Sequence, residues 1–409
     1  MTPDVSAVAA ARGDRWRLTA AGFLRASTTS VVGITLGVHL GRLGLEGPAL
    51  GLVVSSGLVG AALAAVAGTV LADRLGRKRF LLGLSALSVA GTALFAWGSS
   101  PGFLAATAFL GMLNGMGRDR GAALVVEQAA LSSTTTDARR TRVIAVYTML
   151  QDLGHAVGAL LAGAPIWLVH GATSDRLAPL GRDTFLACAG ASLVGLVLYA
   201  GLGRSIEVGA RPGHALLSKA SRSIVLRLSG LFGIDSLGGG FLTTAMLSYF
   251  FFERFGVDER VIGLLFFGAR LMNAGSHLGA AWLAARIGLV NTMVFTHIPS
   301  SVLLVTVAFA PSFPVAAALF LLREGLVEMD VPTRQSYVLA VVRPEERTIA
   351  AGATNLVRLA GWAVAPAFAG ALSTGGSMYL PLVIGAGMKV TYDLLLWRAF
   401  RHVRPPEET

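Results

Sequence analysis

The sequence is poor in charged residues, in aromatic residues and in cysteine. Only 14% of its 409 residues are charged and 8% are aromatic, whereas 54% are hydrophobic. Because soluble domains carry about 25% charged residues, this composition excludes a soluble protein and indicates an integral membrane protein. The single cysteine, Cys188, excludes an intrachain disulfide, and its apolar surroundings predict an unreactive thiol.

The chain also lacks the features of two other protein classes. Residues 1–17 have no apolar core of a signal peptide, and the apolar run 18–40 is long enough to be a true membrane span. A net charge of +11 would suit a nucleic-acid-binding protein. The cations lie in short loops between apolar runs, however, so we expect a lipid bilayer and no nucleic acid as partner.

Long apolar runs predict an all-α integral membrane protein with twelve transmembrane helices. A helix needs about 20 apolar residues to cross a bilayer, and no stretch between the runs is long enough for a soluble domain. The predicted spans are 18–40, 49–71, 80–98, 102–125, 143–169, 183–203, 228–252, 260–285, 292–310, 314–340, 349–373 and 379–398.

The distribution of cations predicts the orientation of these spans. If the N-terminus is cytoplasmic, most Lys and Arg residues of the loops fall on the cytoplasmic side. The opposite loops hold only Arg42, Arg176, Arg182, Arg254 and Arg260. Since cytoplasmic loops carry an excess of Lys and Arg, we expect both termini in the cytoplasm and the protein in the cytoplasmic (inner) membrane.

A short basic turn with one embedded acid joins the second and third predicted spans. Its residues Gly68, Asp73, Arg74, Gly76, Arg77 and Lys78 have the spacing Gly-x3-Ala-Asp-Arg-x-Gly-Arg-Lys. This spacing resembles the loop signature between helices 2 and 3 of the major facilitator superfamily, whose members are secondary transporters with two six-helix halves.

The resemblance implies a gating role for this motif. In that family the matching acid faces the N-terminal end of helix 11, which here would lie near residues 348–351, and helps to lock the two halves. The dipole of a helix stabilises an acid at its N-terminus by about 0.3–1 kcal/mol. The second half has Ala285 where the first has Asp73, so we expect a latch on one side only.

An internal repeat supports two related halves. The segment 71–76 matches 283–288, Gly154 matches Gly361, and 162–163 matches 369–370. We therefore expect an N-terminal six-helix half over 1–203, a cytoplasmic central loop over 204–227 and a C-terminal six-helix half over 228–409. In parallel repeats of this kind the substrate site lies between the halves near the midplane, and we expect the protein to be a monomer.

Many ionisable and amide side chains lie inside the predicted spans. A charge at a helix centre costs roughly 2.5–3.5 kcal/mol on insertion scales, so such residues must line a wet cavity or pair with one another. Guanidinium groups in a cavity suit an anionic substrate because they form forked hydrogen bonds to carboxylate or phosphate. The candidate substrate-binding residues are Arg25, Asn114, Arg118, Gln151, Arg270, Asn273, Asn355 and Arg358.

Helical spacing assigns some of these charges to structural pairs. Arg118 and Arg120 would point in different directions on a helix, so one should face the cavity and the other should pair with an acid. Lys389 and Asp393 are four residues apart and should pair with each other. We also expect structural ion pairs at Glu127, Arg323, Asp330 and Arg334.

Coupling to a proton needs a group that changes protonation within the spans. Asp152 and Glu324 are the first candidates, because burial raises the pKa of a carboxyl group and a neighbouring cation lowers it. His155 is a third candidate, one helical turn from Asp152. The histidines have no metal-ligand spacing, so we expect no metal and no cofactor.

The sequence thus predicts a secondary transporter for a small organic solute, an anion or a zwitterion, with proton coupling as an open possibility. The first alternative is a multidrug/proton antiporter. Two departures from family exporters oppose it, because Gly111 lies where they carry an arginine and Ala159 where they carry a proline. The second alternative is a receptor or assembly factor of the same fold that does not transport. We find no sequence signature of an enzyme.

Overall fold

The computed structural model describes residues 5–135, 137–168, 174–207, 218–343, 346–374 and 379–401. Every regular element in these ranges is a helix. The helices are α1 (Val5–Arg42), α2 (Gly47–Leu75), α3 (Arg77–Phe95), α4 (Pro101–Gly111), α5 (Ala122–Ser133), α6 (Asp137–Leu161), α7 (Ala164–Leu168), α8 (Ser174–Ala200), the 3-10 turn η1 (Arg204–Ile206), α9 (Lys219–Gly240), α10 (Thr244–Phe255), α11 (Glu259–Ile287), α12 (Leu289–Ala308), α13 (Phe313–Val327), α14 (Asp330–Ala340), α15 (Arg347–Leu372) and α16 (Leu380–Phe400).

Ten helical segments of the described chain are long and apolar enough to cross a membrane, judged by length and composition. The predicted spans 102–125 and 314–340 are not among them, because each is divided into two shorter helices. The prediction of continuous helices at these two places was therefore wrong, whereas the all-helical membrane architecture is confirmed.

Local sequence explains both interruptions. The chain leaves the helical path after Gly111, where Met112 and later Gly117 adopt positive φ angles of 52° and 66°. Residues 112–121 include three glycines, which are poor helix formers. Between α13 and α14, Pro332 lies in the first turn of α14, where its missing N–H costs no helical hydrogen bond.

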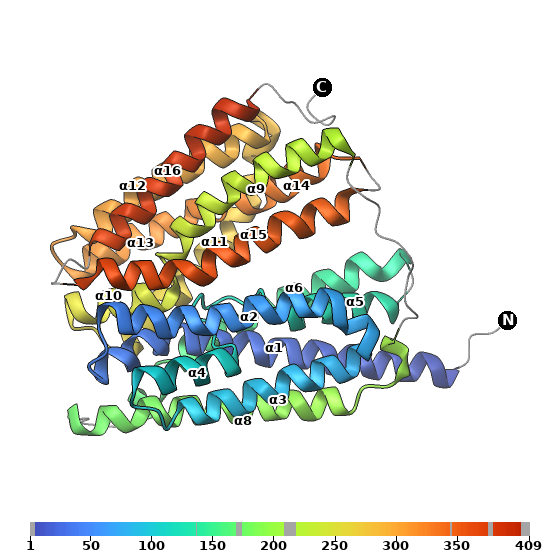
Figure 1. Ribbon diagram of the computed structural model, residues 1–409, viewed down its shortest axis with the longest axis horizontal. Coiled ribbons are helices and arrows are strands. Elements are labelled where there is room, and N and C mark those ends of the chain that lie inside the picture. Colours follow the sequence, from blue (N-terminus) through green and yellow to red (C-terminus); the bar gives the residue numbers. More distant parts are fainter. Residues whose placement is uncertain are drawn as a thin grey trace.

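Figure 1 shows two groups of helices side by side, α1–α8 (blue to green) and α9–α16 (yellow-green to red). In the first group α1 packs against α6 and α8, and α2 packs against α4. In the second group α9 packs against α15 and α16, and α12 packs against α13 and α16. The groups meet where α2 packs on α15, α1 on α10 and α6 on α11.

The two groups are closely packed at the end of the molecule that carries the α1–α2 turn, which we call the α1–α2 end. A Cβ atom on Gly37 of α1 would lie 2.0 Å from the carbonyl oxygen of Ala245 in α10. A Cβ on Gly51 of α2 would lie 2.3 Å from the carbonyl oxygen of Pro366 in α15. Small residues of this kind let helices in a membrane approach backbone to backbone.

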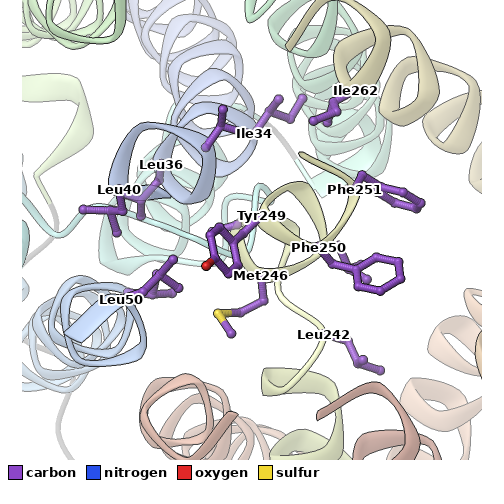
Figure 2. Close-up of a cluster of buried hydrophobic side chains, with 14 of the residues drawn as sticks. Ile34, Leu36, Leu40, Leu50, Leu242, Met246, Tyr249, Phe250, Phe251 and Ile262 are labelled. Carbon is purple, nitrogen blue, oxygen red and sulfur yellow. The ribbon is translucent and has the colours of Figure 1, made fainter. Parts of the chain in front are cut away.

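Apolar side chains fill the core at this junction. Ile34, Leu36 and Leu40 of α1 and Leu50 of α2 are buried, and Figure 2 shows them around the side chains of α10. On the α10 side Met246, Tyr249, Phe250 and Phe251 are each at most 6% exposed. The core thus joins the two helix groups.

The link between the two groups is shorter than the sequence indicated. Helix α9 begins at Lys219, whereas the predicted span began at 228. Ser218 caps it by accepting a hydrogen bond from the Ser221 backbone N–H at 3.3 Å. Residues 208–217 of the predicted central loop lie outside the described residues.

Candidate functional site

A charged cavity of about 120 Å³ lies between the two helix groups. The α4–α5 connection contributes to it from the first group, and each of the helices α9 to α16 contributes from the second. Seven basic side chains line it, namely Arg118, Arg120, Arg270, Arg323, Arg334, Arg358 and Lys389. Four carboxylates line it, namely Asp235, Glu324, Glu328 and Asp330, so positive charge is in excess.

The irregular segment 112–121 is held in this cavity by donors from the second helix group. The carbonyl oxygen of Gly115 accepts a hydrogen bond from the Ala245 backbone N–H at 3.0 Å. The carbonyl of Met116 accepts one from the Thr244 hydroxyl, and that of Gly117 accepts one from Arg270, each at 2.8 Å. Non-helical backbone at membrane depth is tolerated where protein satisfies it in this way.

This irregular segment separates the directions of Arg118 and Arg120. Arg118 forms a 2.8 Å ion pair with Glu328 across the two groups, although the sequence had placed Arg118 among the substrate ligands. Arg120, which the sequence left out of that set, has its guanidinium 4.5 Å from the ring centre of Trp362. Both residues line the cavity, and only Arg118 pairs with an acid. The expectation that just one of them would face the cavity was therefore wrong, because loop conformation and not helical spacing sets their directions.

Carboxylates in the cavity neutralise four of its cations at short range. Arg323 pairs with Glu324, and Arg334 with Asp330. Lys389 lies 2.8 Å from Asp235, and Arg118 pairs with Glu328 as described. Within the described part of the chain, no short carboxylate contact remains for Arg120, Arg270 and Arg358.

These three guanidiniums are only partly satisfied by other groups. Arg270 donates to the Gly117 carbonyl, and Arg358 lies 3.9 Å from Asp235 and 4.4 Å from the centre of the Trp362 ring. The buried Nε atoms of Arg270 and Arg358 have no hydrogen-bond partner in the described structure. Buried donors without partners are costly, so this part of the cavity is suited to receive an anion.

A second buried polar network lies within the first helix group and contains Arg25. Its guanidinium contacts Asp119 at 2.7 Å, Glu127 at 2.5 Å and the Tyr199 hydroxyl at 2.7 Å. Glu127 is completely buried, and Tyr147 and Tyr199 each donate to it at 2.5 Å. Arg25 is thus ion-paired here, apart from the central cavity.

Several other predicted site residues lie around these two networks. Gln151 donates to the Tyr147 hydroxyl at 3.0 Å, and His155 Nε2 accepts the Asp119 backbone N–H at 2.9 Å. Asn114 folds back on its own segment, donating to the Arg118 carbonyl at 2.7 Å. Arg25 and Asn114 also line a separate cavity of about 120 Å³ inside the first group.

The remaining predicted residues differ in burial. Asn273 is buried and donates to Glu324 at 3.0 Å, so Glu324 has both an amide and a guanidinium as partners. Asp152 and Asn355 are exposed in the structure. The structure therefore places Arg118, Arg270, Arg358 and Glu324 of the predicted set in the central cavity.

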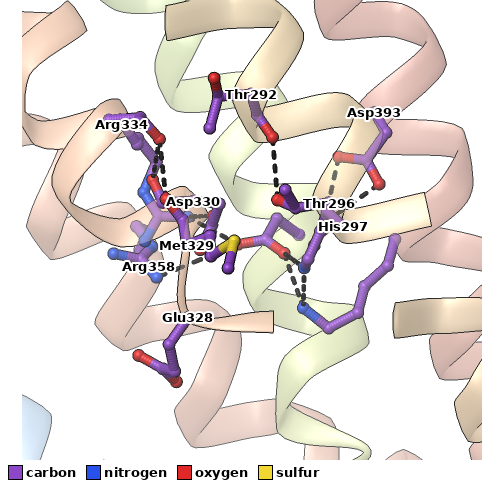
Figure 3. Close-up of polar contacts among 12 residues, drawn as sticks. Thr292, Thr296, His297, Glu328, Met329, Asp330, Arg334, Arg358 and Asp393 are labelled. Carbon is purple, nitrogen blue, oxygen red and sulfur yellow. Dashed lines mark hydrogen bonds and ion pairs between the residues drawn. The ribbon is translucent and has the colours of Figure 1, made fainter. Parts of the chain in front are cut away.

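A third network continues from the cavity into the second helix group, as Figure 3 shows. His297 Nδ1 lies 3.0 Å from both carboxylate oxygens of Asp393, and its Nε2 lies 3.2 Å from Lys389 Nζ. The expectation that Lys389 and Asp393 pair directly was wrong, because His297 of α12 lies between them. Sequence analysis gave His297 no role, although a histidine inside the apolar run 292–310 was a usable signal.

The basic turn between α2 and α3 lies at the opposite end of the molecule from the α1–α2 turn. Gly76 adopts a φ of 93°, which favours glycine. Arg77 donates to Asp73 at 2.9 Å, and the Asp73 side chain is 58% exposed. Glu207, which the sequence did not single out, accepts the backbone N–H groups of Arg77 and Lys78 at 2.8 and 3.1 Å.

The other predicted motif residues hold this turn together. Lys78 donates to the Leu202 carbonyl at 2.7 Å, and Gly68 lets α2 lie close to Phe80 of α3. Arg74 is exposed. The turn is thus anchored to the chain after α8.

An ion pair joins the two groups at the α1–α2 end. Arg42, the last residue of α1, donates two hydrogen bonds to Glu259, the first residue of α11, at 2.6 and 2.5 Å. Both side chains are largely buried, at 11% and 3% exposure. A forked pair of this kind fixes geometry as well as charge.

Comparison with known proteins identifies the family. The family model described as Major Facilitator Superfamily matches residues 18–322 and 228–409. The chain belongs to the major facilitator superfamily. The family and its fold indicate a transporter rather than an enzyme, as expected from the sequence.

Relatives of this superfamily member cover most of its length. An uncharacterized membrane protein of Saccharomyces cerevisiae is 24% identical over 93% of this chain and 92% of its own. The multidrug resistance protein MdtH of Aeromonas salmonicida is 27% identical over 87% of this chain and 86% of its own. The crystal structure of the nucleoside transporter NupG superposes with a TM-score of 0.74 at 14% identity, over 95% of this chain and 99% of that one.

Proposed function

We propose that this superfamily member is a secondary active transporter that moves a small organic anion or zwitterion by alternating access. The observation that carries the proposal is the set of guanidiniums of Arg120, Arg270 and Arg358, which line one cavity without a short carboxylate contact among the described residues. An anion would supply the acceptors that these donors lack. Arg120 belongs to the first helix group and the other two to the second, so one anion could contact both.

Twelve spans complete the proposed topology. The helix pairs α4–α5 and α13–α14 would each cross the membrane as one interrupted span, in addition to the ten segments that are long enough by themselves. The halves would be 1–203 and 228–409, joined by 204–227. The excess of Lys and Arg at the α2–α3 end supports cytoplasmic termini in the cytoplasmic membrane, with the monomer as the functional unit.

The packing of the two groups supports an inward-open state. Close glycine contacts and the Arg42–Glu259 pair close the α1–α2 end, which would face outward in this topology. Asp73 pairs with Arg77 inside its own turn and is largely exposed. In the opposite state Asp73, with the rest of the motif Gly68–Lys78, would contact the N-terminal turn of α15 and act as a cytoplasmic latch.

A proton is the proposed coupling ion. Asp152 is exposed on α6, and no described ion pair occupies it, so it can exchange protons with solvent. Glu324 pairs with Arg323 and accepts a hydrogen bond from Asn273. His155 accepts a backbone N–H through Nε2, so its protonation would require that hydrogen bond to break.

Thermal unfolding of the detergent-purified protein against organic anions, cations and neutral lipophiles tests the substrate class. A ligand at 100 times its dissociation constant stabilises the native state by about 2.7 kcal/mol. We expect anions to raise the unfolding temperature and this shift to disappear in Arg270→Gln and Arg358→Gln. Arg286→Gln is the matched control, because Arg286 is an exposed residue of the same helix as Arg270.

Stabilisation that persists in both cavity variants would contradict the anion site. Stabilisation by lipophilic cations alone would favour the alternative, a multidrug/proton antiporter, with Asp152 or Glu324 as counter-charge. The similarity to MdtH, at 27% identity, is the observation that favours this alternative. Ligand binding without flux in proteoliposomes would indicate a receptor or assembly factor of the same fold.

A further inference from the structure

Asp393 is a buried carboxylate with a single described donor. It is 0% exposed, and both of its oxygens lie 3.0 Å from one atom, Nδ1 of His297. It lies on α16 behind His297 of α12, and it does not line the central cavity, whereas His297 and Lys389 do. A buried carboxylate usually needs two or three donors or a direct cation, so Asp393 is poised to take up a proton.

The donors and acceptors of this cluster have one consistent arrangement. An ammonium group has donors only, so Lys389 Nζ must donate to His297 Nε2, 3.2 Å away. The ring therefore carries its proton on Nδ1 and donates it to Asp393. Lys389 also donates to Asp235 at 2.8 Å. All hydrogen bonds in the chain Lys389, His297, Asp393 thus run in the same direction, from the cavity toward the buried acid.

Charged and aromatic side chains of neighbouring helices surround the hydrogen-bonded series Lys389, His297 and Asp393. Asp235 of α9 lies 3.9 Å from His297 Nε2, and Tyr392 of α16 packs edge-on against the ring at 6.1 Å. Arg334 and Arg358 lie 3.5 and 3.9 Å from the same Asp235. Of the charged groups on the other packed helices, Asp330 pairs with Arg334, Arg323 with Glu324 and Glu328 with Arg118, while Arg270 donates to the Gly117 carbonyl.

We propose that Lys389, His297 and Asp393 form a proton relay that binds one proton from the central cavity at Asp393. This inference rests on the proposed transport function, because it assigns the site that would bind the coupling ion. The carboxylates and histidine expected from sequence, Asp152, His155 and Glu324, lie on other helices. Asp235 holds Lys389 at the mouth of the relay, beside the Arg358 guanidinium that would bind the anion.

Each step of the relay balances in protons. An N–H bond of the Lys389 ammonium breaks as an N–H bond forms at His297 Nε2. The Nδ1–H bond breaks as an O–H bond forms on Asp393. The neutral lysine amine then takes a proton from hydronium in the cavity water. The net result is one bound proton, a neutral Asp393 and a histidine that has changed tautomer without becoming an imidazolium.

Infrared difference spectroscopy of the full-length protein in detergent tests the end point without any substrate. On acidification from about pH 8 to about pH 5, we expect a gain of the carbonyl band of a protonated carboxylic acid. Part of this band should be lost in Asp393→Asn and kept in Asp258→Asn, a matched change in the α10–α11 loop outside the network. Identical difference spectra for the wild type and Asp393→Asn would overturn the proposal.

Nitrogen NMR of histidine-labelled protein tests the relay itself and does not need the Asp393 variant to fold. The His297 signal is the one that disappears in His297→Gln. In the wild type we expect the His297 signal to move from the Nδ1-protonated to the Nε2-protonated tautomer as the pH falls. In Lys389→Met we expect His297 to keep one tautomer over the same pH range. An imidazolium signal at His297, or one unchanged tautomer in the wild type, would contradict the relay.

Failure of the relay is distinguishable from failure of the transport proposal. Both spectroscopic measurements use the protein without substrate, so they report on Lys389, His297 and Asp393 alone. If anions stabilise the protein through Arg358 but the infrared band of Asp393 does not respond to pH, the anion site is supported and the relay is contradicted. If the infrared band of Asp393 responds to pH but no anion binds, the proton site is supported and the proposed substrate class is contradicted.

Discussion

Trp362 contacts two of the three cavity guanidiniums that lack a short carboxylate contact in the described structure. Arg120 and Arg358 lie 4.5 and 4.4 Å from the centre of its ring, one from each helix group, and Trp362 is 6% exposed. Like charges repel each other, so a ring whose face attracts cations is needed to hold both guanidiniums near one point. The indole thereby prepares the cavity for an anion before the anion arrives.

Replacing Trp362 with Leu should weaken anion binding while preserving the fold. Cation–π contacts contribute about 0.5–2 kcal/mol each, and the loss of about 1–2 kcal/mol corresponds to a rise in dissociation constant of about 5- to 30-fold. The dissociation constant is obtained by titrating the purified variant with the anion that stabilises the wild type. Trp97→Leu is the control, because Trp97 also stacks on an arginine, Arg182, but away from the cavity.

Equal affinities in Trp362→Leu and the wild type would show that Arg120 and Arg358 do not depend on the ring. Equal losses in Trp362→Leu and Trp97→Leu would indicate a general loss of stability and would contradict a specific role for Trp362.

At the scale of elements, the interrupted span α4–α5 is the part of the first group that depends most on the second. Its carbonyls at Gly115, Met116 and Gly117 accept donors from Ala245, Thr244 and Arg270. Without these donors, three carbonyls would be unsatisfied at mid-depth. The irregular segment is therefore stable only when the other helix group is present.

Thr244→Val should destabilise the protein by removing one of these donors. The change keeps the shape of the side chain but leaves the partly buried Met116 carbonyl without the hydroxyl, at a cost of about 1–3 kcal/mol. Thermal or denaturant unfolding in detergent measures it. Thr306→Val should cost much less, because the exposed Thr306 donates only to Leu303 in its own helix. Equal effects of the two changes would count against this role of Thr244.

At the scale of the whole molecule, closure of the α1–α2 end is held by features that alternating access must break. These are the backbone contacts at Gly37 and Gly51 and the forked pair Arg42–Glu259. Hydrogen bonds to charged groups contribute about 1.5–3 kcal/mol. An interaction of this size, made in one state only, is large enough to set the balance between two states.

Glu259→Gln should shift the population toward the state that is open at this end. With Ala245→Cys as reporter, we expect the rate of labelling by a membrane-impermeant thiol reagent to rise by about tenfold. Background labelling should be low, because the native Cys188 is buried. Asp258→Asn in the same background is the control, since Asp258 pairs with Arg260 in its own helix group. Unchanged labelling in Glu259→Gln would exclude the pair as a lock.

Part of the central cavity could be predicted from the sequence. Arg270 and Arg358 were found because a charge in an apolar run needs a cavity or a partner, and that argument uses composition alone. Arg120 was left out of the ligand set and Arg118 included in it, because the argument assumed a continuous helix through residues 112–121. Glu207, His297 and Asp393 contact residues distant in the sequence, so no local pattern could predict those partners.

The sequence by itself determined three properties of the chain: its class as a helical membrane protein, its family and the position of its basic turn. These follow from hydropathy, charge bias and spacing, which are local properties. Only the tertiary structure decided which charges neutralise each other and which remain free. Several buried charges have their partner on a helix distant in the sequence, as with Arg118 and Glu328 or Lys389 and Asp235. Such pairing depends on how the helices pack, and helix packing is not a local property of the sequence.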